Sequence, residues 1–421
     1  MTPTDWIAAA LVPALLVAMA GLILMSRLPR ALKLLVLAGL ALRVVGAVTR
    51  YLVLTQYYHG VGDAIGYFDV GLGYARSFRH WDFSQVLDPL IWREGTWTGT
   101  QFMYLPSGLV LAVIGPTLVG EFVVFSLFAF VGLLGFARAF RRAFPTVPLS
   151  RYARWIWLFP SLWFWPSSVG KEAVIMLGIG LAVLGYIGRR GRINWFAIGS
   201  GTVLVYAVRP QFAAVLVLCF IVGHWLSFGG KWTPARMVQG VLILALGLGA
   251  IWYSLRTIGA GGFDVEGVQS YIETEPARRV GGGSAIDAVP LSPLGAPQAL
   301  FNVLFRPFPW EVDNPMVAFS CLEMLFFWGL VIHQRRRLAI SLRQWRSNRL
   351  LRVSIPFVLA YSLSIGFLIT NLGIIARQRV FLFPFLFAIL EAMPQLPKEL
   401  AQQESKEGDV ATLLDPAPAS T

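Results

Sequence analysis

Charged residues are scarce in this sequence. Asp, Glu, Lys and Arg make up 14% of its 421 residues, whereas hydrophobic residues make up 56%. Soluble domains contain about 25% charged residues, so this chain has too few to cover a surface that faces water. The composition excludes an ordinary soluble protein and predicts a chain that crosses a membrane many times.

Cysteine and histidine are also rare. The two cysteines, Cys219 and Cys321, both lie within apolar runs, which indicates packing residues and argues against a disulfide. The four histidines show no HExxH or HxxxH spacing. The sequence therefore predicts no dedicated zinc site.

Apolar runs of about 20 residues, the length that crosses a bilayer as a helix, are abundant. They predict an all-α, polytopic membrane protein with about 11–12 transmembrane helices. We expect one transmembrane domain, residues 1–396, with outer loops at 56–101 and 257–313. The charged, proline-containing residues 397–421 predict a disordered cytoplasmic tail.

Positive charge exceeds negative charge, with a formal net charge of +13, and the arginines and lysines gather in short clusters. Short basic loops remain in the cytoplasm, so the clusters at 189–192, 229–236 and 334–352 predict the inner face. No nucleic-acid partner is expected, because the clusters are not part of a soluble basic fold. The segment SRLPRALK (26–33) also predicts the inner face, and a count of crossings from it leaves 138–142 outside, against the same rule. Either a segment of 80–101 re-enters the membrane, or the rule fails at that cluster.

The stretch YYHGVGDAIGYFDVGLGYA (57–75) carries the first candidate site. Asp63, Tyr67 and Gly71 are spaced i, i+4 and i+8, which would place them on one stripe of a helix. Asp63 is a candidate general base, because a carboxylate can accept a proton from an acceptor hydroxyl or amine. Asp69 is a second carboxylate nearby. The alternative is an interfacial helix whose acids are simply solvated.

This stretch and FMYLPSGLVLAV (102–113) resemble the first outer loop and following helix of GT-C glycosyltransferases, polytopic enzymes that use polyprenyl-phosphate sugars. The resemblance covers mainly residues 40–115. It implies a GT-C-like fold, a catalytic role for Asp63, a polyprenyl-linked sugar donor and a glycan or lipid acceptor. The motifs PSSVGKE, VRPQ and LFRPFPWE further resemble bacterial polysaccharide-assembly membrane proteins.

A metal requirement stays open, because the chain lacks the adjacent DxD or ExD pair of that family. Any divalent metal is expected to be held by substrate phosphates together with one carboxylate. No other cofactor is predicted.

The stretch FWPSSVGKEAVI (164–175) places Lys171 and Glu172 between two apolar runs. It is not a P-loop, because Trp165 stands where that motif requires Gly and Glu172 stands where it requires Ser or Thr. Pro166 and the two serines after it predict a break between two helices, with a serine capping the second. Either both charges reach water at the tip of this hairpin, or Lys171 and the free N–H groups face a phosphate.

Further arginines occur in turns that the crossing count places on the outer face, where positive residues are disfavoured. We expect them to bind the phosphate or pyrophosphate of a substrate, because the guanidinium fork suits that geometry. The alternative is that each arginine extends singly to lipid headgroups. The predicted substrate-binding residues are Tyr67, Asp69, Lys171, Glu172, Arg209, Arg306, Glu311, Arg377 and Arg379.

Three functions follow from these residues. The first is a glycosyltransferase that moves a sugar from a polyprenyl-(pyro)phosphate donor to a glycan or lipid acceptor at the outer leaflet, in cell-surface polysaccharide or glycoconjugate synthesis. The second is a polymerase or ligase of lipid-linked repeat units. The third is a transporter or flippase for an anionic lipid-linked substrate. The short loops and the lack of an ER-retention signal favour a multi-pass protein of a bacterial inner membrane, in contact with membrane lipids.

Overall fold

The computed structural model of the protein describes residues 3–87, 97–189, 192–226, 284–290 and 292–392. Within these residues the chain forms helices joined by turns and loops, with two isolated backbone bridges, Arg189 with Arg192 and Ala285 with Asn371. Several predicted segments lie wholly or partly outside the described residues, namely 229–236, 237–256, 257–313 and 397–421.

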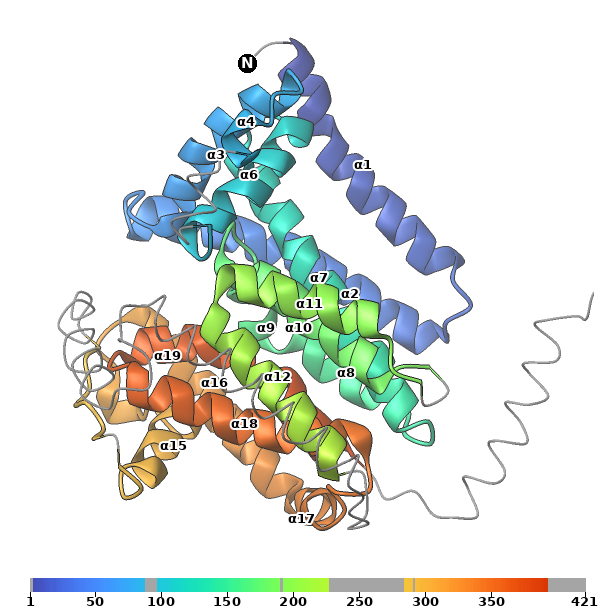
Figure 1. Ribbon diagram of the computed structural model, residues 1–421, viewed down its shortest axis with the longest axis vertical. Helices are drawn as coiled ribbons and strands as arrows, with labels where there is room; N and C mark the ends of the chain where they lie inside the picture. The colour runs from blue at the N-terminus through green and yellow to red at the C-terminus, as the bar shows by residue number, and fades with distance from the viewer. Residues whose placement is uncertain (1–2, 88–96, 190–191, 227–283, 291, 393–421) are drawn as a thin grey trace, which may run out of the picture.

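The helices begin at residues that suit a helix start. Asn194, Asn314, Asn348 and Asn371 each accept a hydrogen bond from a backbone N–H group of the first turn. The helices, labelled in Figure 1, are α1 (Pro3–Met25), α2 (Arg30–Leu52), α3 (Asp63–Arg79), α4 (Ser84–Leu87), α6 (Thr100–Ile114), α7 (Leu118–Ala143), α8 (Leu149–Leu158), α9 (Pro160–Phe164), α10 (Lys171–Ile187), α11 (Trp195–Val208), α12 (Pro210–Trp225), α15 (Ala296–Leu304), α16 (Pro315–His333), α17 (Arg335–Arg343), α18 (Arg349–Leu368), α19 (Leu372–Arg379) and α20 (Phe383–Glu391). A π-helical turn, Val53–Tyr57, extends α2.

Four of the described helices are long and apolar enough to cross a membrane, and the pair α19 and α20, bent by 56°, gives a fifth candidate. The four are Arg30–Tyr57, Leu118–Ala143, Pro315–His333 and Arg349–Leu368. The described part of the chain is therefore all-α, with apolar helices of a membrane-embedded protein, as predicted. The count is lower than the predicted 11–12, because several apolar runs form helices of only 10–17 residues, short of the ~20 that span a bilayer.

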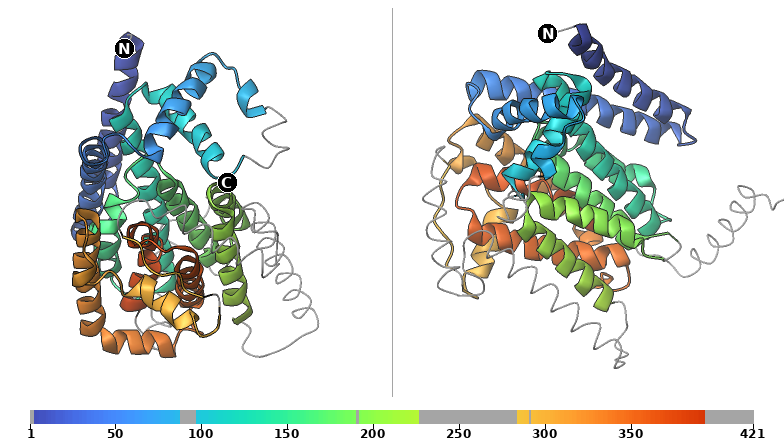
Figure 2. Two further views of the ribbon diagram at one scale, coloured as in Figure 1. Left: turned by 90° about the vertical axis from the view of Figure 1, so that its left-hand side faces the viewer. Right: turned by 45° about the horizontal axis from the view of Figure 1, so that its top comes forward.

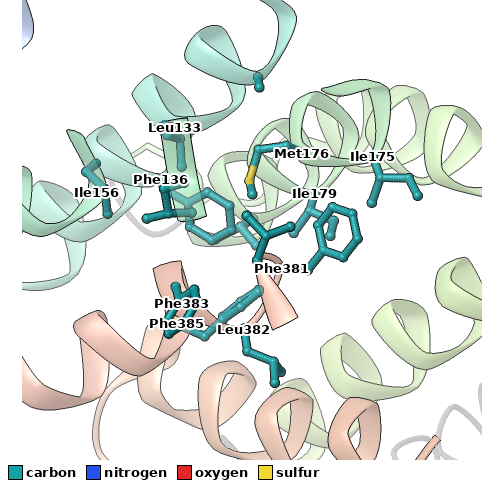
Figure 3. Packing of buried hydrophobic residues seen from close by; sticks show 14 of the residues in the cluster. Leu133, Phe136, Ile156, Ile175, Met176, Ile179, Phe381, Leu382, Phe383 and Phe385 are labelled. Carbon is teal, nitrogen blue, oxygen red and sulfur yellow. The ribbon is translucent and has the colours of Figure 1, made fainter. Parts of the chain in front are cut away.

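The apolar core lies where α7, α8 and α10 meet the chain at the start of α20 (Figure 3). Phe136 of α7 and Phe385 of α20 pack edge to face, with ring centroids 5.1 Å apart. Ile175, Met176 and Ile179 of α10 are all buried beside them. These contacts join residues from the middle of the chain to residues near its end. By contrast, α1 runs along the outside of the bundle (Figure 2).

Glycines bring α10 into backbone contact with its neighbours. A Cβ added to Gly132 of α7 would lie 2.2 Å from the carbonyl oxygen of Met176, and one added to Gly180 of α10 would lie 2.1 Å from that of Gly132. Gly178 of α10 and Gly201 of α11 meet in the same way. Small residues allow membrane helices to approach closely, so α10 is fixed between α7 and α11.

α10 and α11 connect two ends of the molecule. α10 begins at Lys171, and its 17 residues extend about 25 Å to Gly188. α11 then returns to Arg209. We call the end that holds Lys171 and Arg209 the site end, and the end that holds the 189–192 turn the basic end.

Arg142, in the last turn of α7, donates a hydrogen bond of 2.9 Å to the carbonyl oxygen of Gly188. The end of α7 therefore lies at the basic end, beside the 189–192 turn. The crossing count had assigned the cluster at 138–142 to the opposite face. This contact removes the conflict between that cluster and the other basic turns.

Most of the described part of the expected outer loop 56–101 is helical. The buried residues of α3 form a stripe that packs on α6, and they are Ala64, Tyr67, Gly71, Ala75 and Phe78. A Cβ on Gly71 would lie 2.2 Å from the Ser107 hydroxyl oxygen, so α3 and α6 are in close contact. That hydroxyl lies 2.9 Å from the Tyr67 carbonyl oxygen and 2.6 Å from a carboxylate oxygen of Glu121, which links α3 and α6 to α7.

The described part of the expected loop 257–313 is folded against the bundle. The backbone N–H of Ile286 donates to the carbonyl oxygen of Thr370 at 2.8 Å, and that of Leu372 donates to Ser284 at 2.9 Å. α15 packs on α18, where a Cβ on Gly366 would lie 2.4 Å from the Ala299 carbonyl oxygen. Residues 284–304 therefore form part of the wall around α19, which carries Arg377.

Candidate functional site

Glu172 lies at the centre of the polar residues at the site end. α9 ends at Phe164 and α10 begins at Lys171, so the predicted break at Pro166 is present. The predicted serine cap is wrong, because Gly170 is the N-cap of α10 and makes no side-chain cap bond. Glu172 is 1% exposed. The interpretation in which both charges reach water is therefore wrong for Glu172.

Two arginines approach the buried carboxylate of Glu172. Nη2 of Arg377, from α19, donates to Oε2 at 2.7 Å. Nη2 of Arg209, from the turn between α11 and α12, lies 3.7 Å from Oε1. Oε1 has no hydrogen-bond partner among the described residues. A buried charge needs a partner, and Arg377, which lies 205 residues after Glu172 in the sequence, supplies it.

Lys171 lies on the more exposed side of this group. Its ammonium group donates to the hydroxyl of Thr100, the first residue of α6, at 3.2 Å. It is also within electrostatic range of Arg209, Asp63, Glu172 and Arg377. We call Asp63, Lys171, Glu172, Arg209 and Arg377 the Glu172 cluster.

Asp63 is the exposed carboxylate of the Glu172 cluster. It begins α3, directly after Gly62, and its charge acts on both Lys171 and Arg377. Tyr67, one turn later, is 2% exposed. Burial, reinforced by the Asp63 carboxylate, raises the pKa of Tyr67 to about 12, so its hydroxyl remains neutral at physiological pH. Asp69 is exposed, away from the buried stripe of α3.

Arg306, Glu311 and Arg379 contact one another rather than Glu172. Arg306 Nε donates to Glu311 Oε1 at 2.6 Å, and Arg379 Nη2 donates to the Arg306 carbonyl oxygen. Arg379 is two residues after Arg377, and two residues turn a helix by about 200°, so the two side chains leave α19 on opposite sides. The expected grouping of these three residues with Lys171 is thus not found.

Sequence reasoning did not assign roles to Arg50 and Thr100. The Arg50 guanidinium lies 5.3 Å from the ring centroid of Phe164 and 5.4 Å from that of Trp165, within electrostatic range of Glu172 and Arg377. The sequence did carry a signal for Arg50, an arginine near the end of an apolar helix. A charge there is costly, so it is expected to have a function. Thr100 carried no signal, because its contact with Lys171 joins residues 71 apart.

The segment 97–100 lies against the same turn as Arg209. The Gly99 N–H donates to the Ala207 carbonyl oxygen at 2.8 Å, and the Trp97 ring lies 5.9 Å from that of Tyr206. This places an aromatic face beside the Glu172 cluster. Aromatic faces of this kind stack on sugar rings, and they also line membrane interfaces.

No family model, curated protein or solved structure matches the chain. Within the described residues, no group of three His, Cys, Asp or Glu side chains has a geometry that could hold a metal ion. The Glu172 cluster itself therefore shows what chemistry the site can perform.

The Glu172 cluster combines two chemical capabilities. Lys171, Arg209 and Arg377 supply three positive charges, and the buried Glu172 and the exposed Asp63 supply two negative charges, so the Glu172 cluster has a net charge of +1. Asp63 supplies an exposed carboxylate in the first turn of α3, next to these cations. An anion held by the cations would therefore lie close to a group that can accept a proton.

Proposed function

We propose that the protein is a membrane glycosyltransferase that moves a sugar from a polyprenyl-(pyro)phosphate donor to a glycan or lipid acceptor. The Glu172 cluster is the observation that carries this proposal. A phosphate leaving group fits its excess of positive charge, and an acceptor hydroxyl fits the exposed carboxylate of Asp63.

The transfer proceeds by a single displacement with inversion at the anomeric carbon. Asp63 accepts the proton of the acceptor hydroxyl while the acceptor oxygen forms its bond to that carbon. The bond between the carbon and the donor phosphate oxygen breaks, and its electron pair stays on the phosphate. Lys171, Arg209 and Arg377 stabilise the charge that develops there.

Glu172 acts through the arginines and does not touch the substrate in this mechanism. Its contacts at 2.7 Å to Arg377 and 3.7 Å to Arg209 hold two cations from different helices in one orientation. Cations that are already oriented need no rearrangement when charge develops on the leaving group. Glu172 is therefore a positioning residue.

The proposal includes a GT-C-like architecture in a bacterial inner membrane, with the site end facing the outer leaflet. The basic turns at 189–192 and 334–352 support this orientation, because such turns remain in the cytoplasm. A donor whose lipid tail stays in the bilayer reaches the site end from the side. Cell-surface polysaccharide or glycoconjugate synthesis is the corresponding process.

The substitution Asp63→Asn tests the proposal, in cells from which the native gene has been deleted. We expect it to lower the transfer rate by about 10²- to 10⁴-fold, the usual contribution of a general base. The measurement is mass spectrometry of lipid-linked glycans, with membrane protein levels compared by immunoblotting. Asp287→Asn, which removes another exposed carboxylate, is the matched control.

A full complement of glycan with Asp63→Asn at normal protein level would remove Asp63 as the base. The same glycan profile separates the other candidates. Loss of one sugar from each repeat unit supports transfer, whereas accumulation of complete single repeat units would assign the site to a polymerase or ligase. Complete lipid-linked glycans retained on the cytoplasmic face would assign it to a flippase.

A further inference from the structure

The ends of α7, α10 and α11 surround a second polar site, a cavity of about 940 Å³ at the basic end. Three arginines line it, Arg142 from α7 and Arg189 and Arg192 from the turn between α10 and α11. We call it the arginine cavity. It is separated from the Glu172 cluster by the length of α10, about 25 Å.

Of the residues that the structure describes, no acidic one lines the arginine cavity. Arg142 lies within electrostatic range of both Arg138 and Arg189, and these like charges repel one another. The buried carboxylate at this end, Glu391, contacts a different set of arginines. Among the described residues, the positive charge of the arginine cavity is therefore not balanced by an acidic side chain in its lining.

The backbone that carries these arginines is fixed. Arg189 and Arg192 exchange two backbone hydrogen bonds of 3.1 and 3.0 Å, and the Asn194 N–H donates to the Gly185 carbonyl oxygen at 2.9 Å. Gly188 has φ +68°, and a Cβ there would lie 1.8 Å from the Arg192 carbonyl oxygen, so only glycine fits. Arg142 donates to Gly188 and ties this turn to α7. The backbone at Arg189 and Arg192 is thus tied to α7, while the three arginine side chains are exposed and can reach a ligand.

Exposed aromatic residues mark the level of the cavity in the membrane. Trp195 and Phe196, in the first turn of α11, are 72% and 84% exposed, and Trp195 also lines the cavity. Exposed aromatic rings at the end of an apolar helix are typical of the boundary between lipid and water. The N-terminal end of α11 adds a partial positive charge at the same place.

We propose that the arginine cavity binds the phosphate of an anionic phospholipid headgroup from the cytoplasmic leaflet. The planar guanidinium group forms paired hydrogen bonds to phosphate oxygens. A basic pocket between membrane helices on the cytoplasmic side suits such a headgroup. A zwitterionic headgroup fits less well, because its own cation is repelled by the three arginines. The ligand class is therefore an acidic phospholipid such as phosphatidylglycerol.

The experiment uses the purified full-length protein in a zwitterionic detergent, with phosphatidylglycerol, phosphatidylcholine or inorganic phosphate added separately. Native mass spectrometry measures the bound lipid, and the melting temperature measures its effect on stability. The test variant is Arg189→Gln with Arg192→Gln. The matched control is Arg335→Gln with Arg336→Gln, which removes two exposed arginines of α17 at the same end.

We expect phosphatidylglycerol to bind and stabilise the wild-type protein and the control variant alike, and to bind the test variant roughly thirtyfold more weakly. Arg189→Lys with Arg192→Lys keeps the charge but loses the paired donors, so we expect a smaller loss, about three- to tenfold. This lysine variant decides the question if the glutamine variant does not fold.

Three results would overturn the proposal. Equal weakening in the α17 control would show attraction to diffuse surface charge and not to the cavity. Equal binding of phosphatidylcholine and phosphatidylglycerol would show that the cavity does not recognise an anionic headgroup. Stabilisation by inorganic phosphate alone, with displacement of the lipid, would assign the cavity to a soluble phosphate.

Discussion

Each end of the molecule holds one buried glutamate with arginines around it, and the two carboxylates differ in how many of their oxygens have hydrogen-bond partners. At the basic end, Glu391 is 0% exposed. One of its oxygens accepts from Trp155 Nε1 at 2.7 Å and from Gln334 Nε2 at 3.4 Å. Its arginine partners, at 3.2 to 3.5 Å, are Arg151, Arg154 and Arg337. We call these four charged residues the Glu391 cluster.

Glu172 at the site end is equally buried but has fewer partners. Only Oε2 accepts a hydrogen bond from an arginine, and Oε1 has no hydrogen-bond partner among the described residues. Lys171 stands beside this pair with its ammonium group on a threonine hydroxyl. The carboxylate of the Glu172 cluster is therefore less completely paired than that of the Glu391 cluster.

The difference supports the proposal that the Glu391 cluster is structural and that the Glu172 cluster binds a ligand. Both oxygens of the Glu391 carboxylate have partners, and these contacts join α8, α17 and α20 into one unit. A carboxylate with one unpaired oxygen and neighbouring cations is less stable in itself, because an unsatisfied buried polar atom costs free energy. Such sites are expected where a ligand completes the set of contacts.

Of the substitutions that test this comparison, Glu172→Gln should have the largest effect, on the turnover rate. The substitution removes the charge that orients Arg377 and Arg209 and makes the site end more positive. We therefore expect the turnover rate to fall about a hundredfold while the donor KM stays equal or decreases. The measurement is steady-state kinetics of transfer in purified membranes.

The split between the two kinetic constants distinguishes positioning from folding. A protein that is merely less stable would lose active molecules, with an unchanged KM and an unchanged rate per folded molecule. Glu172→Asp, which keeps the charge on a shorter side chain, should recover part of the rate. A donor KM that rises at least as much as the rate falls would place Glu172 in ground-state binding instead.

Glu391→Gln should have the opposite outcome, a loss of stability without a change in turnover. Removing one member of a buried ion pair costs about 3–5 kcal/mol. The three arginines here are 22%, 46% and 37% exposed and can reach water, so we expect a smaller loss of about 2 kcal/mol. Equilibrium unfolding in mixed micelles measures it. A slower transfer rate per folded molecule would contradict the assignment of the Glu391 cluster as structural.

The sequence predicted the local features of the site end. The spacing of Asp63, Tyr67 and Gly71 predicted one helical stripe, and Tyr67 and Gly71 do lie on the buried stripe of α3. Pro166 predicted the break before α10. These features depend on residues within a few turns of one another, and helical periodicity fixes them.

The pairings could not be predicted, because they depend on how distant helices pack. Nothing in the local sequence distinguishes Arg377, which reaches Glu172, from Arg379, which is 1% exposed and binds the Arg306 backbone. Their difference follows from the direction in which α19 lies in the bundle. For the same reason Glu391 and its arginines, separated by 54 to 240 residues, gave no recognisable pattern.

Tyr67→Phe gives the smallest expected effect. It tests whether the Tyr67 hydroxyl is buried beside Asp63, as the raised pKa of Tyr67 requires. The Tyr67 pKa is about 12 in the folded protein and about 10 when unfolded. Its neutral form therefore contributes stability that is fully present below pH 10 and is lost as the pH rises towards 12. Between pH 9 and pH 11 the wild-type protein should lose about 1 kcal/mol more unfolding free energy than Tyr67→Phe.

The exposed Tyr57 supplies the control, because Tyr57→Phe also removes a tyrosine hydroxyl but not a buried one. Asp63→Asn should reduce the difference without abolishing it, since burial is the larger cause of the Tyr67 shift and the Asp63 carboxylate the smaller one. Parallel curves for the wild type and Tyr67→Phe from pH 9 to pH 11 would mean that Tyr67 is solvated. The contact between α3 and the Glu172 cluster, on which the role of Asp63 depends, would then be open to water.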